Sequence, residues 1–291
     1  MSANKEFKEF CSNIRIDSDS VSRVSYRYHR ITKQLNKDFW SSESEDSHSL
    51  YVGSYGRDTD IHTSDIDMLF QLPYEVYQRY NSYSGNGQSA LLQAVKQSVH
   101  RTYNSFIRGD GQVVKVNFTD GICFELVPCF RNPDGSFIYP DTNDGGKWRM
   151  TNPKPEIAAI REGNEIWNGN LKRLCRMARA WKEEWNVPMG GLLIDTLAHK
   201  FLSTWEHRDK SFTYYDWMTR DFLNSLKNQD EERRYWHAIG SNQQVYRKGK
   251  FEYKALCCYN LSLKAIEHES QGNYRSANQC WRKIYGTEFP S

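Results

Sequence analysis

Two aspartates separated by one residue follow a Gly-Ser pair in the stretch GSYGRDTDIHTSDID, residues 53–67. In an extended strand successive side chains alternate between faces, so Asp65 and Asp67 are expected on one side. Two ionised carboxylates on one face repel each other, and a hard divalent cation with oxygen ligands relieves that repulsion. The spacing therefore predicts a metal site. The alternative is a pair of exposed aspartates on an edge strand.

The Gly-Ser pair itself has the composition of a phosphate-binding turn. Gly53 lets the backbone approach a phosphate closely, and Ser54 offers a hydroxyl and an amide to phosphate oxygens. Arg57 is near enough in sequence to add positive charge. The alternative is a solvated turn. An Asp-x-Asp embedded in an apolar strand after such a turn is more specific than either feature alone.

A third acid is expected from another strand. In ICFELVPCF, residues 122–130, alternation places Glu125 on the face opposite Phe124. An acid in an otherwise apolar strand is costly without a partner, and a shared metal would supply one. A salt bridge to a nearby Lys or Arg is the alternative. Asp120 is the competing third acid, but its place in Thr119-Asp120-Gly121 favours a role in a turn.

The surrounding pattern predicts the elements that would position these residues. Apolar residues at steps of three and four predict a helix over 19–40, capped by Ser18 or Ser20, and a second amphipathic helix running from Leu92 to Phe106. Strands are expected at SLYVGS and IDMLFQLP, and a hairpin is expected from 112–118 and 122–130. From about residue 155 long helical stretches follow. The chain is thus predicted to have an α/β half and a helical half.

Composition restricts the class of protein. The 291 residues carry a net charge of +3, which does not by itself indicate nucleic-acid binding, and no basic tail or aromatic-interleaved basic patch is evident. No apolar run is long enough to span a membrane and no secretory signal is visible, so a cytoplasmic protein is expected. The seven cysteines form no Cys-x-x-Cys pair, and the spacing of Cys257, Cys258, His268 and Cys280 favours structural thiols over zinc ligands.

The motif resembles that of the DNA polymerase β-like nucleotidyltransferase superfamily. Within it, GSYGRDTDIHTSDIDML looks like the bacterial CD-NTases, the SMODS-domain cyclic-oligonucleotide synthases related to animal cyclic GMP-AMP synthase and oligoadenylate synthase. Further segments resemble this family in the same order: GNGQSALLQAV, DGQVVKVNFTDGICFELVPCF, LKRLCRMARAWKEEWNVPMGGLLIDTLAHKFL and ANQCWRKIYGTEFP. One position departs from the pattern, because the family's third acid is commonly Asp and here it is Glu125.

The resemblance implies a fold and site roles. The implied fold is α/β (α+β), with a polymerase β-like core and mixed sheet over 1–154, including a long N-terminal helix, and a helical domain over 155–291 that closes an active-site cleft. Asp65, Asp67 and Glu125 would be catalytic ligands for two Mg²⁺ or Mn²⁺ ions, and Gly53 and Ser54 would hold the donor triphosphate. A basic residue near Trp181, either Arg179 or Lys182, would also reach that triphosphate, with a solvated helix face as the alternative.

The implied activity is synthesis of a cyclic oligonucleotide from ATP, GTP or other NTPs. The favoured product is a purine cyclic dinucleotide such as cyclic GMP-AMP, which would activate a separate effector in antiphage (CBASS) signalling. The enzyme is expected to be a monomer that regulatory partner proteins control. Asn242, Gln243 or Asp195 are candidates to read a guanine edge, and Tyr214, Tyr215 and Trp217 are candidates to stack a purine, although such aromatics more often lie in a core. The alternatives are an RNA-directed terminal or tRNA nucleotidyltransferase, and a non-catalytic sensor or scaffold.

Overall fold

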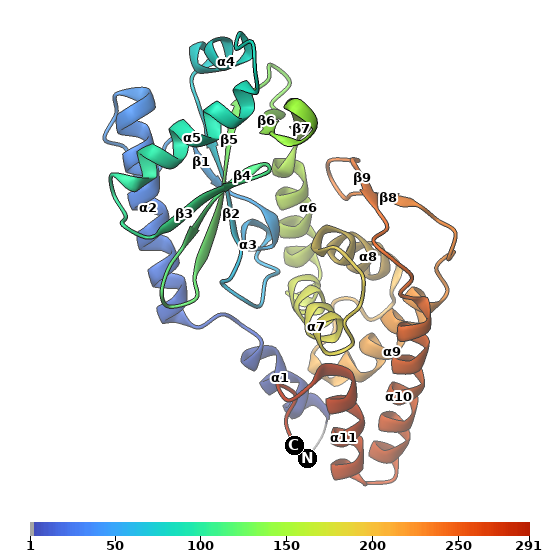
Figure 1. Cartoon of the computed structure of the whole chain (residues 1–291). Helices are drawn as coiled ribbons and strands as arrows, with labels where there is room; N and C mark the ends of the chain where they lie inside the picture. The colour runs from blue at the N-terminus through green and yellow to red at the C-terminus, as the bar shows by residue number, and fades with distance from the viewer. Residues whose placement is uncertain (1–2) are drawn as a thin grey trace. The chain divides into compact units, whose positions relative to one another are not determined.

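The computed structural model describes residues 3–291 and contains both helices and strands (Figure 1). The helices are α1 Ala3–Asn13, α2 Ser18–Trp40, α3 Gly53–Arg57, α4 Tyr74–Asn81, α5 Gly87–His100, α6 Pro153–Ile166, α7 Asn170–Glu184, α8 Gly191–Thr204, α9 Tyr215–Lys227, α10 Glu252–Ser270 and α11 Tyr274–Tyr285. The strands are β1 Ser49–Tyr51, β2 Ile66–Gln71, β3 Phe106–Asp110, β4 Val113–Asn117, β5 Cys123–Arg131, β6 Phe137–Asp141, β7 Lys147–Thr151, β8 Tyr235–His237 and β9 Gln244–Tyr246. None of these described helices is long and apolar enough to cross a bilayer.

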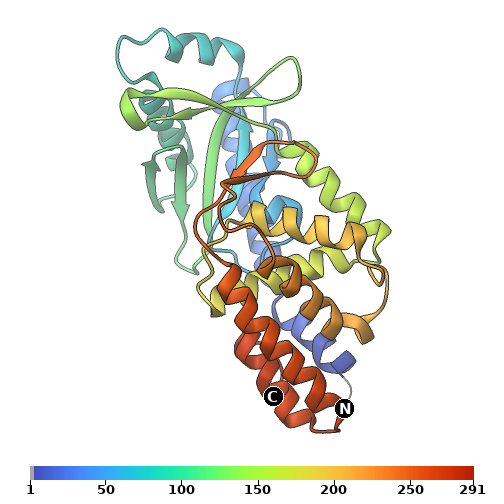
Figure 2. The same ribbon diagram turned by 90° about the vertical axis from the view of Figure 1, so that its right-hand side faces the viewer.

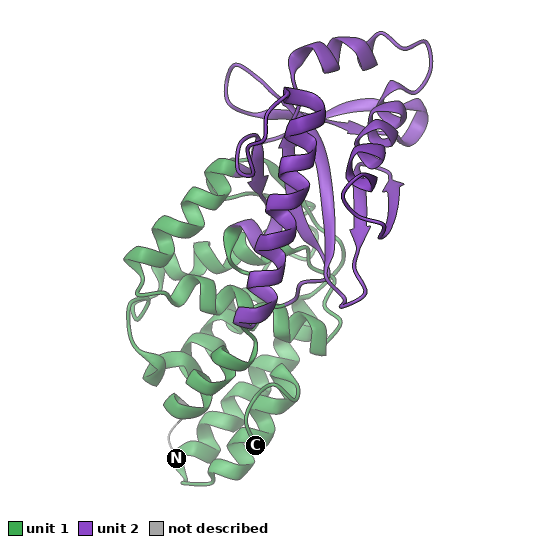
Figure 3. Ribbon diagram, turned by 90° about the vertical axis from the view of Figure 1, so that its left-hand side faces the viewer, with its two compact units in different colours: residues 1–15, 57–61, 154–291 green, residues 16–56, 62–153 purple. Residues whose placement is uncertain are grey.

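The chain divides into two compact units (Figure 3). The sheet unit comprises residues 16–56 and 62–153, and the helical unit comprises 154–291 together with the chain up to Arg15 and residues 57–61. Placing α1 in the helical unit differs from the expected division at residue 154. The reason is apolar burial, because Phe7 and Phe10 are fully buried among Trp281, Tyr285 and Phe289.

The sheet unit is built on a mixed sheet, as the expected fold class requires. Its main path runs β1-β2-β5-β4-β3, with β6 and β7 continuing from β5. The β2–β5 pair is parallel and the other pairs are antiparallel. The predicted hairpin of β4 and β5 is confirmed, with Phe118 and Ile122 closing the turn.

One face of this sheet is covered by α2 and α5 (Figure 1). Val24, Ile31 and Leu35 of α2 pack with even-numbered strand residues such as Phe124 and Leu126. Helix α2 begins at Ser18, and its N-cap is Asp17, whose carboxylate accepts from the Ser20 amide, so the predicted serine cap is wrong. Because β-strand side chains alternate, the odd-numbered residues of β2, β4 and β5 lie on the other face.

Several elements differ from the sequence prediction. Helix α5 ends at His100, and Phe106 opens strand β3 instead of continuing the helix. Helix α4 and the β6–β7 hairpin were not anticipated. The side chain of Phe106 is 67% exposed, so this apolar residue does not mark the buried face of a helix.

The helical unit has a core rich in aromatic side chains. Helices α10 and α11 lie side by side at its C-terminal end (Figure 2), and Trp181 of α7, Tyr215 of α9 and Trp281 of α11 are almost completely buried. The small antiparallel β8–β9 hairpin interrupts the predicted helical run between α9 and α10. The seven cysteines, all within the described chain, form no disulfide.

Candidate active site

The Gly-Ser turn lies directly against the second aspartate of the Asp-x-Asp pair. The Val52 amide donates to the Asp67 carbonyl at 3.0 Å, which fixes the end of β1 beside β2. Gly53 then adopts φ +62°, and a Cβ added there would lie 1.7 Å from Oδ2 of Asp67. Glycine is therefore required twice, for its left-handed backbone and for the close approach of a carboxylate.

The parallel pairing of β2 with β5 brings two of the three predicted acids, Asp67 and Glu125, onto neighbouring strands. Asp67 is the register partner of Glu125, and Asp65 immediately precedes β2. Asp67 and Glu125 lie on the face of the sheet opposite the α2–α5 core, and the alternation of β2, extended by one residue, assigns Asp65 to the same face. Burial raises the pKa of the Cys123 thiol, and the negative charges of nearby Glu125 and Asp65 raise this pKa further.

Lys115 is a neighbour of this acidic face that sequence analysis missed. Its Nζ lies 2.8 Å from Glu125 Oε1 and 3.4 Å from Asp110 Oδ2. The hydrogen bond to Glu125 raises the pKa of Lys115. The salt-bridge alternative for Glu125 is thus present in the structure. The signal was available, because a turn centred on Asp120 places residue 115 opposite residue 125, and the β4–β5 register does pair them.

The donors suit a divalent cation by their chemistry, since carboxylate oxygens are the ligands that Mg²⁺ and Mn²⁺ prefer. Because Gly53 has no side chain, position 53 does not cover the Asp67 carboxylate. Among the described residues, however, no three His, Cys, Asp or Glu side chains already form a metal-ligating group. The Lys115 ammonium contacts Glu125, the acid predicted as third ligand.

Asp120 has a different role from the face acids. Its carboxylate accepts from both terminal nitrogens of Arg27 at 2.8 and 2.9 Å, and Arg23 lies 3.3 Å away. The hydrogen bond to Arg27 holds the pKa of Asp120 below its usual value. Asp120 therefore ties the β4–β5 turn to α2, in keeping with its predicted role as a turn residue.

Two arginines predicted to bind nucleotide are engaged elsewhere. Asp195 accepts from Nε of Arg57 at 2.7 Å and from Nη1 of Arg179 at 2.6 Å, and it is fully buried. Burial alone would raise the pKa of Asp195, but the two guanidinium groups outweigh it and hold the pKa at about 2. Arg57 and Arg179 are themselves only 6% and 7% exposed. These three residues form a buried ion cluster, and the structure gives no support to the predicted triphosphate contacts of Arg57 and Arg179 or to a base-reading Asp195, which stay predictions.

The remaining candidates lie in the helical unit, apart from Ser54 of the sheet unit. Lys182 is half-exposed in the last turn of α7, and Asn242 and Gln243 lie in the turn between β8 and β9. Tyr215 is buried and its hydroxyl donates to Asn170, so it is a core residue, whereas Trp217 is 39% exposed. Ser54 is half-exposed in the first turn of α3, where its predicted phosphate role stays a prediction.

Comparison with known sequences supports one family. The family model of the Second Messenger Oligonucleotide or Dinucleotide Synthetase domain (SMODS) matches residues 1–164. A probable cyclic nucleotide synthase of Bacillus cereus is 24% identical over 212 residues, covering 70% of this chain and 60% of the relative. A cyclic AMP-AMP-AMP synthase of Acinetobacter sp. is 22% identical over 219 residues, covering 74% of this chain and 63% of the relative. The match thus spans less than two thirds of the length of these relatives.

Comparison with solved structures shows the same fold over nearly the whole chain. Escherichia coli CdnC, solved with ATP, is 14% identical with a TM-score of 0.73, covering 99% of both chains. Vibrio cholerae DncV, a cyclic AMP-GMP synthase, is 11% identical with a TM-score of 0.63, covering 99% of this chain and 87% of that one. With the family model matching more than half of the chain, this protein belongs to the SMODS family of CD-NTase-type proteins.

Proposed function

We propose that this protein is a template-independent nucleotidyltransferase that joins NTPs into a cyclic oligonucleotide and releases pyrophosphate. One observation carries the proposal: the Gly53 turn lies against Asp67, and Asp67 is in register with Glu125 on the adjacent strand. Membership of the SMODS family supports the same reaction class.

The proposed division of labour follows from the chemistry of each side chain. Asp65, Asp67 and Glu125 would hold two Mg²⁺ or Mn²⁺ ions, which when bound neutralise the triphosphate and favour an in-line attack by a ribose hydroxyl. Gly53 allows the triphosphate to approach the backbone, and Ser54 donates to a phosphate oxygen. Lys182 remains the candidate cation for the triphosphate, because Arg57 and Arg179 are held by Asp195.

The proposed product is a purine cyclic dinucleotide of the cyclic GMP-AMP kind, made in the cytoplasm as a second messenger for a separate effector in antiphage signalling. ATP as one substrate is supported by the CdnC structure, which was solved with ATP. A regulatory partner is supported by the complex of CdnC with HORMA-deltaN, which matches with a TM-score of 0.75 at 14% identity. The three-adenine product named for the Acinetobacter relative is the competing ring.

The experiment is an incubation of the purified chain with radiolabelled single NTPs and NTP pairs, with and without Mg²⁺. We expect a phosphatase-resistant product that needs a purine NTP and the metal, and nuclease digestion would give its linkage. The Asp65→Asn, Asp67→Asn double variant should fold and make no product, whereas Asp120→Asn should remain active. A phosphatase-sensitive ladder, or full activity of the double Asn variant, would refute the proposed reaction.

A further inference from the structure

A basic, aromatic segment forms the β8–β9 hairpin of the helical unit. Between positions 233 and 250 the sequence RRYWHAIGSNQQVYRKGK has five Lys and Arg and neither Asp nor Glu. The net charge of the whole chain, +3, hides this local excess. The expectation that the chain has no aromatic-interleaved basic patch is therefore wrong for this segment, and the strand pairing brings its two basic, aromatic ends together.

The hairpin has one buried face and one exposed face. Trp236 is 1% exposed and Val245 packs with it against the core of the helical unit. On the other face the register pairs Tyr235 with Tyr246 and His237 with Gln244. Tyr235 is 38% exposed and Tyr246 is 64% exposed, with their ring centroids 6.0 Å apart. The rings of Tyr235 and Tyr246 are therefore neighbours on a solvent-exposed face.

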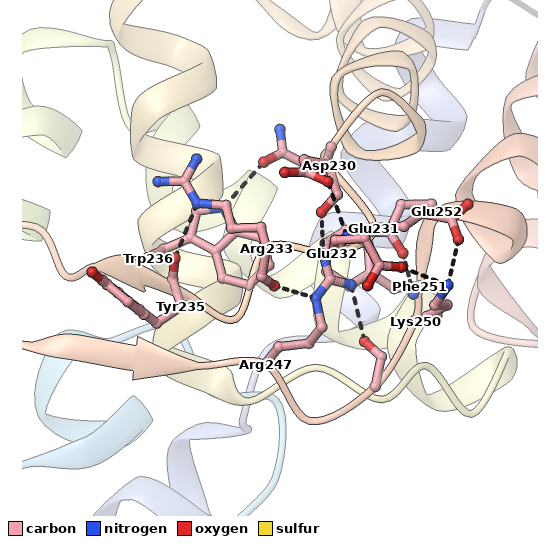
Figure 4. Close-up of polar contacts among 12 residues, drawn as sticks. Asp230, Glu231, Glu232, Arg233, Tyr235, Trp236, Arg247, Lys250, Phe251 and Glu252 are labelled. Atoms are coloured by element: carbon pink, nitrogen blue, oxygen red, sulfur yellow. Dashed lines mark hydrogen bonds and ion pairs between the residues drawn. The ribbon is translucent and has the colours of Figure 1, made fainter.

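Arg247 holds this exposed face rigidly in place (Figure 4). Its guanidinium donates to the carbonyls of Asp230 and Arg233 and forms an ion pair with Glu252 at 2.8 Å. It also stacks on the rings of Trp236 and Phe251, at 4.9 and 5.0 Å from their centroids. These contacts fix the start of β8 and the end of β9, so the tyrosines are presented on a preorganised support.

The cations of the hairpin are not equivalent. Arg247 is engaged by Glu252, and Lys250 pairs with Glu231 and Glu232 (Figure 4). Arg234 and Lys248 are exposed, and neither pairs with an acidic side chain of the described chain. Lys200 of α8 has its pKa lowered by partial burial and by the charge of Arg233, which indicates a positive local potential. Positive charge is therefore available next to the two tyrosine rings.

We propose that the exposed face of the β8–β9 hairpin binds single-stranded nucleic acid. Bases would stack on Tyr235 and Tyr246, while Arg234 and Lys248 would contact the phosphates. Proteins that bind single strands without sequence preference combine these two components, an aromatic platform and a basic track. An acidic peptide would use the cations but would gain little from two exposed aromatic planes. This site belongs wholly to the helical unit and does not depend on the proposed cyclic product.

The test measures fluorescence anisotropy of the full chain with fluorescein-labelled oligo(A) RNA and DNA of about 12 nucleotides. Tyr235→Ala and Tyr246→Ala should each weaken binding roughly 5- to 150-fold, the range for loss of one base–aromatic stack. Tyr235→Phe and Tyr246→Phe should bind like the unchanged chain, because a phenyl ring still stacks. Lys248→Ala should weaken binding and reduce the salt dependence. Tyr74→Ala is the matched control, since Tyr74 is 63% exposed on α4 of the sheet unit.

The outcomes separate this site from the others. Asp65→Asn should leave oligonucleotide binding unchanged, and labelled poly-glutamate should not bind. The proposal is overturned if the unchanged chain binds neither oligonucleotide, or if the Ala variants bind as tightly as the Phe variants. It is also overturned if poly-glutamate binds with the same dependence on Lys248, which would indicate an acidic protein partner. Loss of NTP turnover in the Ala variants with unchanged oligonucleotide binding would assign the hairpin to the NTP site instead.

Discussion

Replacing Gly53 with alanine tests whether the Gly-Ser turn is shaped to admit the Asp67 carboxylate. Gly53 has φ +62°, and Gly111 has nearly the same backbone, with φ +61°. A Cβ at Gly111 would meet only the Asn143 side chain at 3.6 Å, whereas a Cβ at Gly53 would lie 1.7 Å from Oδ2 of Asp67. Gly111→Ala should cost about 1–2 kcal/mol for the left-handed backbone alone. Gly53→Ala should cost about 1–3 kcal/mol more, because the aspartate must be displaced.

The assay is urea denaturation of both variants, combined with turnover of radiolabelled NTP. Displacing Asp67 by about 1 Å should lower the turnover of Gly53→Ala on the order of 100-fold, while Gly111→Ala should retain it. In an Asp67→Ala background the two nearest atoms are gone, so Gly53→Ala should lose most of its extra cost. Equal destabilisation by the two glycine substitutions, or normal turnover of Gly53→Ala, would refute the reasoning.

Four further predictions concern charged groups. Glu125→Gln should lower turnover about 100-fold or more, because a metal ligand is lost. Lys115→Met should lower the Mg²⁺ concentration needed for half-maximal rate, because it frees Glu125 from its ion pair. An increased Mg²⁺ requirement of Lys115→Met would contradict this second prediction. Asp195→Asn should lower the free energy of unfolding, measured in urea, by about 3–5 kcal/mol, because buried Arg179 then loses its carboxylate partner and Arg57 keeps only Glu156, at 3.8 Å; a loss below about 1 kcal/mol would contradict it. Burial raises the pKa of Glu269 to about 7, although the hydrogen bond from Trp281 acts in the opposite direction. The carboxyl group of Glu269 therefore binds its proton more tightly in the folded chain than in the unfolded chain. The free energy of unfolding consequently falls as the pH rises from about 4.5 to 7. Glu269→Gln should therefore raise the free energy of unfolding by about 1–2 kcal/mol at pH 8, allowing for solvent screening of this half-buried side chain, and should change it little at pH 5. Equal effects at the two pH values would count against this prediction.

Local sequence patterns predicted much of the sheet unit. The two-residue period of ICFELVPCF placed Glu125 and Phe124 on opposite faces, and the Thr119-Asp120-Gly121 turn predicted the β4–β5 hairpin. These features depend on residues within one strand or one turn, where alternation and turn chemistry leave few alternatives. The long α2 helix is likewise predicted from local sequence, because its apolar residues recur at steps of three and four. Its N-cap was misassigned, because Asp17, Ser18, Asp19 and Ser20 all have capping side chains.

Local patterns were less informative for the charged helix residues. Arg173, Arg176 and Arg179 recur at helical spacing, and nothing in that spacing distinguishes a phosphate ligand from a buried ion partner. The distinction came from Asp195, which lies 16 residues beyond Arg179 and 138 beyond Arg57. A buried carboxylate needs a counter-charge, but the sequence does not say which cation supplies it.

The residue spacing alone predicts a glycine turn followed by two aspartates on one side of an extended segment. The spacing does not reveal which strand lies beside that segment, and this depends on the folded sheet. The parallel pairing of β2 with β5 sets Asp67 opposite Glu125, and antiparallel pairing of β4 with β5 adds Lys115 to the same row. Likewise, pairing β8 with β9 sets Tyr235 beside Tyr246. Periodicity fixes which way a side chain points within its own strand, whereas the partner strand is selected by burial of a core assembled from residues distant in the chain.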